Sequence, residues 1–506
     1  MIKATLFVNH QEAPVRERAS LFECAEAIGI HVPTSCIKQG KCRECLLEIE
    51  SGMEHLSART AEEEHLGEGF RLACRTRIES DGVIRCHTMR RAAMRIVDEA
   101  SGLSPGHVER RPGRGIALDV GTTTVAMRVY DLDTGRELAR ESFENPQRFG
   151  GSDVMARIHY DTSHPGRLLQ RTLLGYLRQS IERFDIAPDS LVEMVVAGNT
   201  TMRDLFFGLD VYPIGQKPYK STHEKSLTLP AHKLRLPLHR DAPVYGLPII
   251  GSHVGADAAA ALLATGLHRS DEIAVLMDIG TNTELIVGNR DRLVAASCPA
   301  GPAFEGGGVV CGMPALDGAI ERIALNGSGT PKTSVIGGVA PEGICGSGLV
   351  DLMSELLRTE RMNAQGRFAD DGGAFEVAEG IVFTEHDMNE LAQAKGANVA
   401  GVQIVTDVYG IEFDDIDRFY LAGGFASYLD LDAARRIGLI PDIPDDKIVR
   451  VGNAAIEGAA RALLAPSLRS ELDELVTTIE HIELETHPDF FDFFVEGCQF
   501  ERVRSR

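Results

Sequence analysis

The sequence of 506 residues contains no run of about 18 uncharged apolar residues, the length that a membrane-spanning helix requires. It also lacks the apolar stretch of a signal peptide, because its first residues lead directly into the strand-like alternation of Ala4 to Val8. From these two absences we expect a cytoplasmic protein with no membrane partner.

Two common nucleotide-binding patterns are also missing. Neither the P-loop pattern GxxxxGK[ST] nor the dinucleotide-binding pattern GxGxxG occurs, which excludes the P-loop and Rossmann classes. Tryptophan is absent as well, so a visible chromophore would stand out against weak near-ultraviolet absorption. The composition, 43% hydrophobic and 25% charged, is that of a folded chain, and its length suggests about three domains.

Positive charge does not balance negative charge beyond residue 95. Residues 1–95 contain 14 Lys and Arg and 14 Asp and Glu, whereas the whole chain has a formal net charge of −22. Residues 96–506 therefore carry the entire excess of negative charge. This acidic character disfavours nucleic acid as a partner, and its simplest role is solubility.

The ten cysteines are unevenly distributed. Six lie within the first 86 residues: Cys24, Cys36, Cys42, Cys45, Cys74 and Cys86. Disulfide frameworks are rare in cytosolic proteins, so we interpret the crowding as a metal site. Cys24 falls on a predicted helix and Cys86 on a predicted strand, and both are interpreted as core thiols.

The other four have a spacing typical of iron–sulfur ligands. Cys36, Cys42 and Cys45 follow a C-x5-C-x2-C pattern, and 28 residues separate Cys45 from Cys74. Three clustered thiolates and one distant thiolate predict a 2Fe-2S cluster, although the first gap is one residue longer than in plant-type ferredoxins. Gly40 would let the loop bend toward the cluster. A structural zinc site and ordinary free thiols are the alternatives.

We place these cysteines in a first domain over residues 1–95. Residues 96–114 contain two Pro and three Gly and predict a flexible linker on which the first domain could swing. The junction is basic, with Arg85, Arg90, Arg91, Arg95, Arg110, Arg111 and Arg114. A solvated surface or a docking site for an acidic partner would explain these arginines.

From residue 115 onward, strand and helix patterns alternate, and two of the turns have the same sequence pattern. In each, a buried strand ends in Asp and is followed by an aliphatic residue, Gly-Thr-x-Thr and a second strand. The first turn contains Asp119, Gly121, Thr122, Thr123 and Thr124. The second, 159 residues later, contains Asp278, Gly280, Thr281, Asn282 and Thr283.

A related strand end follows each turn, Ala197-Gly198-Asn199 after the first and Ala422-Gly423-Gly424-Phe425 after the second. This repetition predicts an internal duplication, with lobes at about 115–270 and 271–470 and a C-terminal extension. Glycine lets a backbone approach a polyphosphate, and N–H groups and Thr hydroxyls can donate to its oxygens.

Each Asp stands where hydrated Mg2+ would bridge the phosphates of ATP, so Asp119 and Asp278 are the predicted catalytic carboxylates. Gly423, Gly424 and Phe425 are predicted to contact the adenosine. Asp257, at the start of an Ala-rich helix, is predicted to be either a first-turn carboxylate or a cleft residue. The glycines after Glu305 and those at Gly346 and Gly348 could line the cleft through helix N-termini.

The two hairpins and the Leu421–Phe425 element resemble the sugar kinase/Hsp70/actin ATPase superfamily. Joined to an N-terminal 2Fe-2S domain, they resemble the ATP-dependent reductive activators of corrinoid-dependent methyltransferases. The resemblance implies a β-grasp ferredoxin-like domain followed by a duplicated, actin-like (ribonuclease H-like) two-lobed ATPase over residues 115–506, a combination of α/β and α+β folds.

The resemblance also implies a reaction, in which ATP drives the reduction of cob(II)alamin to cob(I)alamin through the 2Fe-2S cluster. The corrinoid would belong to a partner protein of a methyltransferase system, because the chain has no D-x-H-x-x-G corrinoid motif. An unidentified low-potential electron donor and a possible homodimer complete the expectation. Known activators can have a further domain between ferredoxin and ATPase, and here it looks absent or reduced.

Two other functions agree with the same residues. One is the activation of another low-potential enzyme, as in the hydroxyacyl-CoA dehydratase activators, although those hold a 4Fe-4S cluster between two subunits. The other is a small-molecule kinase with a regulatory iron–sulfur domain.

Overall fold

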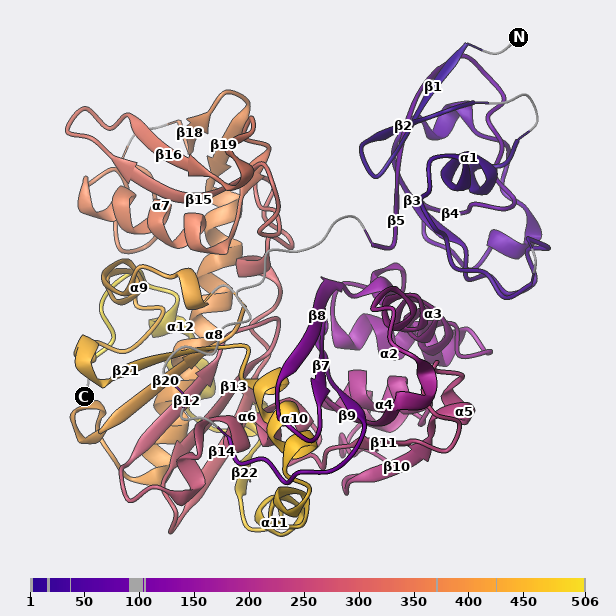
Figure 1. The fold of residues 1–506 in the computed structure, drawn as a ribbon. Helices are drawn as coiled ribbons and strands as arrows, with labels where there is room; N and C mark the ends of the chain where they lie inside the picture. Colours follow the sequence, from indigo (N-terminus) through magenta and orange to yellow (C-terminus); the bar gives the residue numbers. More distant parts are fainter. Residues whose placement is uncertain are drawn as a thin grey trace.

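The computed structural model describes residues 3–15, 19–36, 38–90, 103, 106–369, 372–424 and 426–504. A small N-terminal domain rests on one side of two larger lobes (Figure 1). No helix in this described part is long and apolar enough to cross a membrane.

The N-terminal domain is a five-stranded mixed sheet with one helix against it. Its strand order is β2-β1-β5-β3-β4, and β1 and β5 run parallel. The strands are β1 (Ala4–Val8), β2 (Gln11–Ala13), β3 (Leu46–Ser51), β4 (Phe70–Leu72) and β5 (Gly82–Thr88). Helix α1 (Leu21–Ala27) starts at a capping box, in which Ser20 and Glu23 bond to each other's backbone N–H. The strand expected from the alternation of Ala4 to Val8 is present as β1, and Cys24 lies on a helix as predicted.

The two lobes each contain a six-stranded sheet, and five strands of one sheet correspond in order to five strands of the other. In the first, β6 pairs antiparallel with β7 and parallel with β9; in the second, β12 does the same with β13 and β20. The first sheet contains β6 (Arg114–Val120), β7 (Thr124–Asp131), β8 (Glu137–Glu144), β9 (Leu191–Gly198), β10 (Leu227–Pro230) and β11 (Pro243–Gly246). The second contains β12 (Ala274–Asp278), β13 (Thr283–Gly288), β14 (Leu293–Cys298), β20 (Arg418–Ala422), β21 (Ile448–Gly452) and β22 (Glu480–Ile482). The duplication predicted from the two turns is present in the fold.

Helices and smaller strands complete each lobe. The first lobe has α2 (Val154–Ser163), α3 (Leu168–Arg183), α4 (Thr200–Phe207) and α5 (Ala231–Leu234). The second has α7 (Gly346–Arg358), α8 (Glu385–Tyr409), α9 (Leu431–Ile437) and α12 (Phe490–Gly497), with strands β15 (Ala319–Leu325), β16 (Pro331–Val335), β17 (Gly343–Ile344), β18 (Ala374–Ala378) and β19 (Ile381–Thr384). Because β22 joins the second sheet and α12 packs on α8, the predicted C-terminal extension is an integral part of this lobe.

Two helices lie between the sheets (Figure 1). Helix α6 (Ala256–Thr265) follows β11 of the first sheet, and α10 (Ala454–Leu464) follows β21, an edge strand of the second sheet. They pack against each other, and α10 returns to β6 and β9 of the first sheet. Each helix contributes residues to apolar clusters on both sides, so the pair is the structural link between the lobes. Helix α11 (Ser467–Leu475) lies beside them.

The linker expected over residues 96–114 is ordered at its C-terminal end. The N–H of Glu109 bonds to the carbonyl of Leu464, and Gly113 accepts a bond from the N–H of Leu132. Residues 106–113 therefore lie against the first lobe, and the prediction of flexibility is wrong for them. The part of the predicted linker before residue 106 lies outside the described residues, apart from Leu103.

Two arginines of the basic junction have a different role from both of those expected. Arg90 pairs with Glu141 of β8, and Arg111 pairs with Glu193 of β9. These two arginines therefore bind acidic side chains of the same chain, because this part of the junction lies against the first lobe. Neither a solvated surface nor an external acidic partner is needed to explain them.

The closeness of α6 and α10 depends on a glycine. A Cβ atom at Gly458 would stand 1.8 Å from the carbonyl oxygen of Ala260, so Gly458→Ala must force the two helices apart. We expect this variant to lose about 1–3 kcal/mol of unfolding free energy, measured by chemical denaturation. Gly327→Ala is the matched control, because a Cβ there would meet no atom within 4 Å. Equal stability of the two variants would contradict this account of the helix pair.

Candidate functional site

The four predicted cluster cysteines form two pairs of thiols in contact. The thiols of Cys36 and Cys42 are hydrogen-bonded to each other, and so are the thiols of Cys45 and Cys74. The bond from the Cys45 thiol raises the pKa of Cys45 and lowers the pKa of Cys74 to about 7. Within each pair, the two thiols lie close enough to share one proton.

Backbone N–H groups of the loop converge on two of these sulfurs. Burial raises the pKa of Cys36, but bonds from the N–H groups of Cys42, Gln39 and Lys41 outweigh burial and lower it. The N–H of Gly40 bonds to Cys74 and lowers its pKa in the same way. Gly40 has a φ of 75°, and a Cβ there would lie 2.2 Å from the Nε of Arg75. The loop therefore requires glycine at this position, as the sequence indicated.

These residues fit a 2Fe-2S cluster. A cluster with four Cys ligands has two thiolates on each iron, which matches two pairs better than one gathered set. Cys24 on α1 and Cys86 on β5 are buried core residues, and burial raises the pKa of Cys86 to about 12.

The predicted phosphate hairpins face each other across a cleft between the lobes. The hydroxyls of Thr123 and Thr281 lie 3.1 Å apart. Residues of both lobes line this cleft. Of the predicted residues it is lined by Asp119, Gly121, Thr122, Thr123, Thr124, Asp278, Gly280, Thr281, Asn282, Gly423 and Gly424.

Two predicted residues do not belong to this lining. Thr283, the first residue of β13, is completely buried in the sheet, which contradicts its prediction as a nucleotide contact. Phe425 lies outside the described residues. Gly423 has a φ of 111°, and a Cβ there would lie 2.2 Å from the carbonyl oxygen of Ile279, so it packs directly against the second hairpin.

Carboxyl groups gather in the cleft. Burial raises the pKa of Asp278 to about 8, helped by the charges of Asp257 and Asp119. Burial also raises the pKa of Asp257 to about 6 and that of Glu284 well above its usual value. Several acids that raise one another's pKa form a site that a divalent cation would neutralise. Asp257 combines the two predicted roles, since it lies in the first turn of α6 and also lines the cleft.

One further carboxylate connects the hairpins. Glu305 accepts a bond from Thr123 at 2.8 Å and one from Thr281 at 2.5 Å. These are the hydroxyls that the sequence assigned to phosphate, one from each lobe. Glu305 is followed by a loop rather than by the predicted helix, whereas α7 does begin at Gly346 in the cleft wall.

Three asparagines position the hairpins, and the sequence did not identify their roles. Asn199 donates to the hydroxyl of Thr122 and Asn453 to the carboxylate of Asp119, each at 2.8 Å. Asn145 donates to the carbonyl of Gly121, also at 2.8 Å. Asn199 lies in a strand end that the sequence pattern had singled out. Asn145 and Asn453 come close to the first hairpin only in the tertiary fold.

Models of known families match three successive parts of the chain. A 2Fe-2S iron-sulfur cluster binding domain matches residues 6–79, the RACo middle region matches 114–270, and the C-terminal domain of RACo, the ASKHA domain, matches 272–505. The expectation that a middle domain is absent or reduced is therefore wrong, because the first lobe is that region. The 2Fe-2S domain and the ATPase superfamily predicted from the sequence are confirmed.

Individual relatives agree with these matches. The chain is 32% identical over 428 residues to the corrinoid activation enzyme RamQ of Eubacterium limosum, which covers 78% of this chain and 72% of RamQ. It is 26% identical over 415 residues to a Co(II) methylated amine-specific corrinoid protein reductase of Methanosarcina barkeri, covering 75% and 76% of the two chains. A solved reductive activator for corrinoid, iron-sulfur protein superposes with a TM-score of 0.71 at 27% identity over 99% of both chains. The chain therefore belongs to the RACo family of reductive activators of corrinoid proteins, in which a 2Fe-2S domain is joined to an ASKHA ATPase domain.

Proposed function

We propose that this chain uses ATP to drive the one-electron reduction of a corrinoid held by a partner protein, from cob(II)alamin to cob(I)alamin. The observation that carries the proposal is the presence, in one chain, of paired loop thiols and a cleft lined by two phosphate hairpins. The relatives named as corrinoid activators support the choice of partner.

Cys36, Cys42, Cys45 and Cys74 are the proposed ligands of the 2Fe-2S cluster. When bound, the cluster supplies a one-electron carrier between a low-potential donor and the partner's cobalt. The chain's own contribution is to aim the N–H groups of the loop at the sulfurs, which favours the thiolate forms that bind iron.

The cleft residues have the second role. Thr122, Thr123 and Thr281 would donate to phosphate oxygens, and Asp119 and Asp278 would hold Mg2+ through its waters. Gly423 and Gly424 lie where the adenosine would approach the second hairpin. Since each lobe supplies one hairpin, a bound nucleotide favours one arrangement of the lobes, and hydrolysis releases that preference. This cycle couples ATP to a reduction that is unfavourable by itself.

The direct test mixes the chemically reduced protein, Mg-ATP and a cob(II)alamin-containing methyltransferase corrinoid protein. We expect the cob(I)alamin absorption band to grow only when ATP is present, and ATP hydrolysis to rise when the corrinoid protein is added. ATP consumed in phosphorylating a small molecule, with no cob(I)alamin formed, would contradict the proposal and favour a kinase.

The cluster assignment can be tested by two serine substitutions. Cys74→Ser should lose most of the visible absorption of the anaerobically reconstituted protein, because one iron would lack a thiolate. Cys86→Ser should retain it, since Cys86 lies in β5 away from the loop. Visible absorption and the electron paramagnetic resonance of the reduced protein are the measurements. Equal losses in both variants would refute the ligand set.

The ATPase assignment can be tested by removing one carboxylate at a time. Asp119→Asn and Asp278→Asn should lower stimulated hydrolysis by about 10²-fold or more, because a preorganised charge that positions Mg2+ is lost. The 2Fe-2S spectrum should remain. Asp133→Asn, in the exposed turn before β8, is the control. Normal stimulated hydrolysis in either cleft variant would show that its Asp only shapes the turn.

A further inference from the structure

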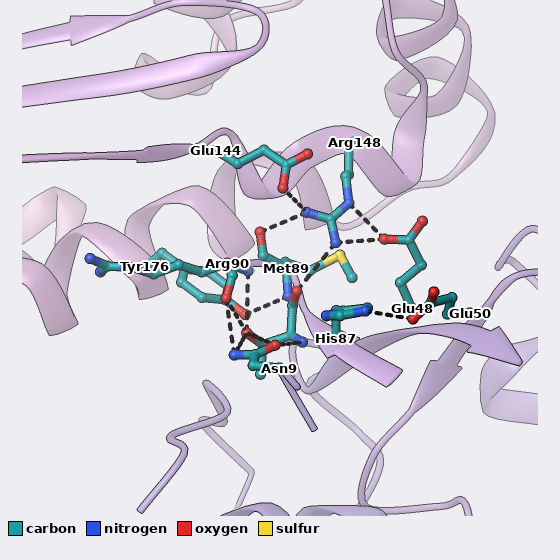
Figure 2. A network of polar contacts seen from close by, with 10 residues as sticks. Asn9, Glu48, Glu50, His87, Met89, Arg90, Glu144, Arg148 and Tyr176 are labelled. Carbon is teal, nitrogen blue, oxygen red and sulfur yellow. Dashed lines mark hydrogen bonds and ion pairs between the residues drawn. The ribbon is translucent and has the colours of Figure 1, made fainter. Parts of the chain in front are cut away.

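Arg148 of the first lobe binds the N-terminal domain through several hydrogen bonds and ion pairs of its guanidinium group (Figure 2). Arg148 donates to the carbonyls of Met89 at 3.0 Å and Thr88 at 3.2 Å, directly after β5. The same guanidinium forms ion pairs with Glu48 of β3 and with Glu144 of its own lobe, both at 2.7 Å. Its side chain is only 13% exposed, so these bonds are largely shielded from water.

The segment that Arg148 binds is itself held firmly in place. Asn9, at the end of β1, accepts a bond from the N–H of Thr88 and donates to the carbonyl of Arg90 (Figure 2). The N–H of Met89 bonds to the hydroxyl of Tyr176 on α3, and both residues are buried. The apolar core of the N-terminal domain continues into the first lobe at this point. The contact is thus a packed interface.

A second contact reaches the cysteine loop. Arg171 of α3 donates to the carbonyl of Cys42 at 2.6 Å and pairs with Glu44 at 2.7 Å. Docking therefore places a cation from the ATPase beside the proposed cluster ligands Cys42 and Cys45.

Arg148 is also close in sequence to the nucleotide cleft. It lies in the short helix η3 (Pro146–Gly150), whose N-cap is Asn145. The N–H of Asn145 donates to the carbonyl of Thr123 at 2.6 Å and its side chain to the carbonyl of Gly121. Only two residues thus separate Arg148, which holds the N-terminal domain, from Asn145, which holds the first phosphate hairpin.

We propose that Asn145 and Arg148 are positioning residues that couple nucleotide binding at the first hairpin to docking of the 2Fe-2S domain. The inference rests on the proposed nucleotide site. The docked domain fixes η3 through Arg148, and η3 fixes the hairpin through Asn145. A hairpin that is already ordered loses less conformational freedom when it binds a triphosphate.

The coupling must act in both directions. If docking strengthens nucleotide binding, nucleotide binding strengthens docking by the same factor. ATP would then hold the 2Fe-2S domain against the first lobe, with Arg171 beside the cysteine loop, and release of the hydrolysis products would free it.

The test measures how tightly the full-length protein binds a non-hydrolysable ATP analogue with Mg2+, by calorimetry. Arg148→Ala should weaken binding by roughly tenfold, within the usual range of such couplings. Glu48→Gln should act in the same direction from the N-terminal domain, where it cannot alter the cleft directly. Arg140→Ala is the matched control, because Arg140 is an exposed arginine of β8 that pairs with Glu137.

A double-mutant cycle separates coupling from packing. Asn145→Ser keeps a capping oxygen but removes the amide that donates to Gly121, so Arg148→Ala should have little further effect in that background. Wild-type affinity in both Arg148→Ala and Glu48→Gln would overturn the inference, as would an undiminished Arg148→Ala effect beside Asn145→Ser. A wild-type chain that binds no analogue would overturn the nucleotide site itself, and the inference with it.

Hydrogen exchange gives a second readout that a purely structural interface would not move. The peptide containing Met89 should exchange more slowly when the ATP analogue is bound, because the Met89 N–H bonds to Tyr176 in the docked state. This nucleotide effect should disappear in Asn145→Ser, while the visible spectrum of the cluster shows that the domain remains folded. Exchange that is independent of the nucleotide in the wild-type protein would overturn the coupling.

Discussion

The crossing of α6 and α10 is the constraint on which the ATPase depends. Helix α6 follows β11 of the first sheet and α10 follows β21 of the second, and the two helices meet where Gly458 lies against the backbone of Ala260. The N-terminal ends of both helices reach the cleft, through Asp257 in the first turn of α6 and Asn453 at the cap of α10. A change in the angle between the lobes therefore moves these polar groups together with the hairpins.

The chemistry of the cleft explains why its residues tolerate so much like charge. Asp119, Asp257 and Asp278 raise the pKa of one another or of Glu284, an arrangement that would be costly in a site of purely structural purpose. Functional sites often keep such buried like charges, because a ligand of opposite charge removes the repulsion between them. Glu305, bonded to a threonine from each lobe, occupies the donors that a phosphate would use.

The sequence predicted the elements whose chemistry is local. The Asp-x-Gly-Thr turns and the C-x5-C-x2-C loop each need particular residues at short spacing, so these patterns can be recognised without knowledge of the fold. Asn145, Asn453 and Glu305 act across 24 residues or more, and no local pattern marks a residue whose partner is supplied by tertiary packing. The prediction of a flexible linker failed for the same reason at residues 106–113. The Pro and Gly content reports on the local backbone, and it does not show that these residues lie against the first lobe.

Two interfaces hold the three parts of the molecule together, and each interface joins the first lobe to a different part. The α6–α10 pair joins the first lobe to the second, whereas Arg148, Arg171 and Tyr176 join the first lobe to the 2Fe-2S domain. The first lobe is thus the common body to which both other parts are attached. In the proposed cycle, closure of the cleft would rotate this body relative to the second lobe, and a docked 2Fe-2S domain would turn with it. A rearrangement at the bound phosphates would thereby displace the cysteine loop, which Arg171 joins to the first lobe.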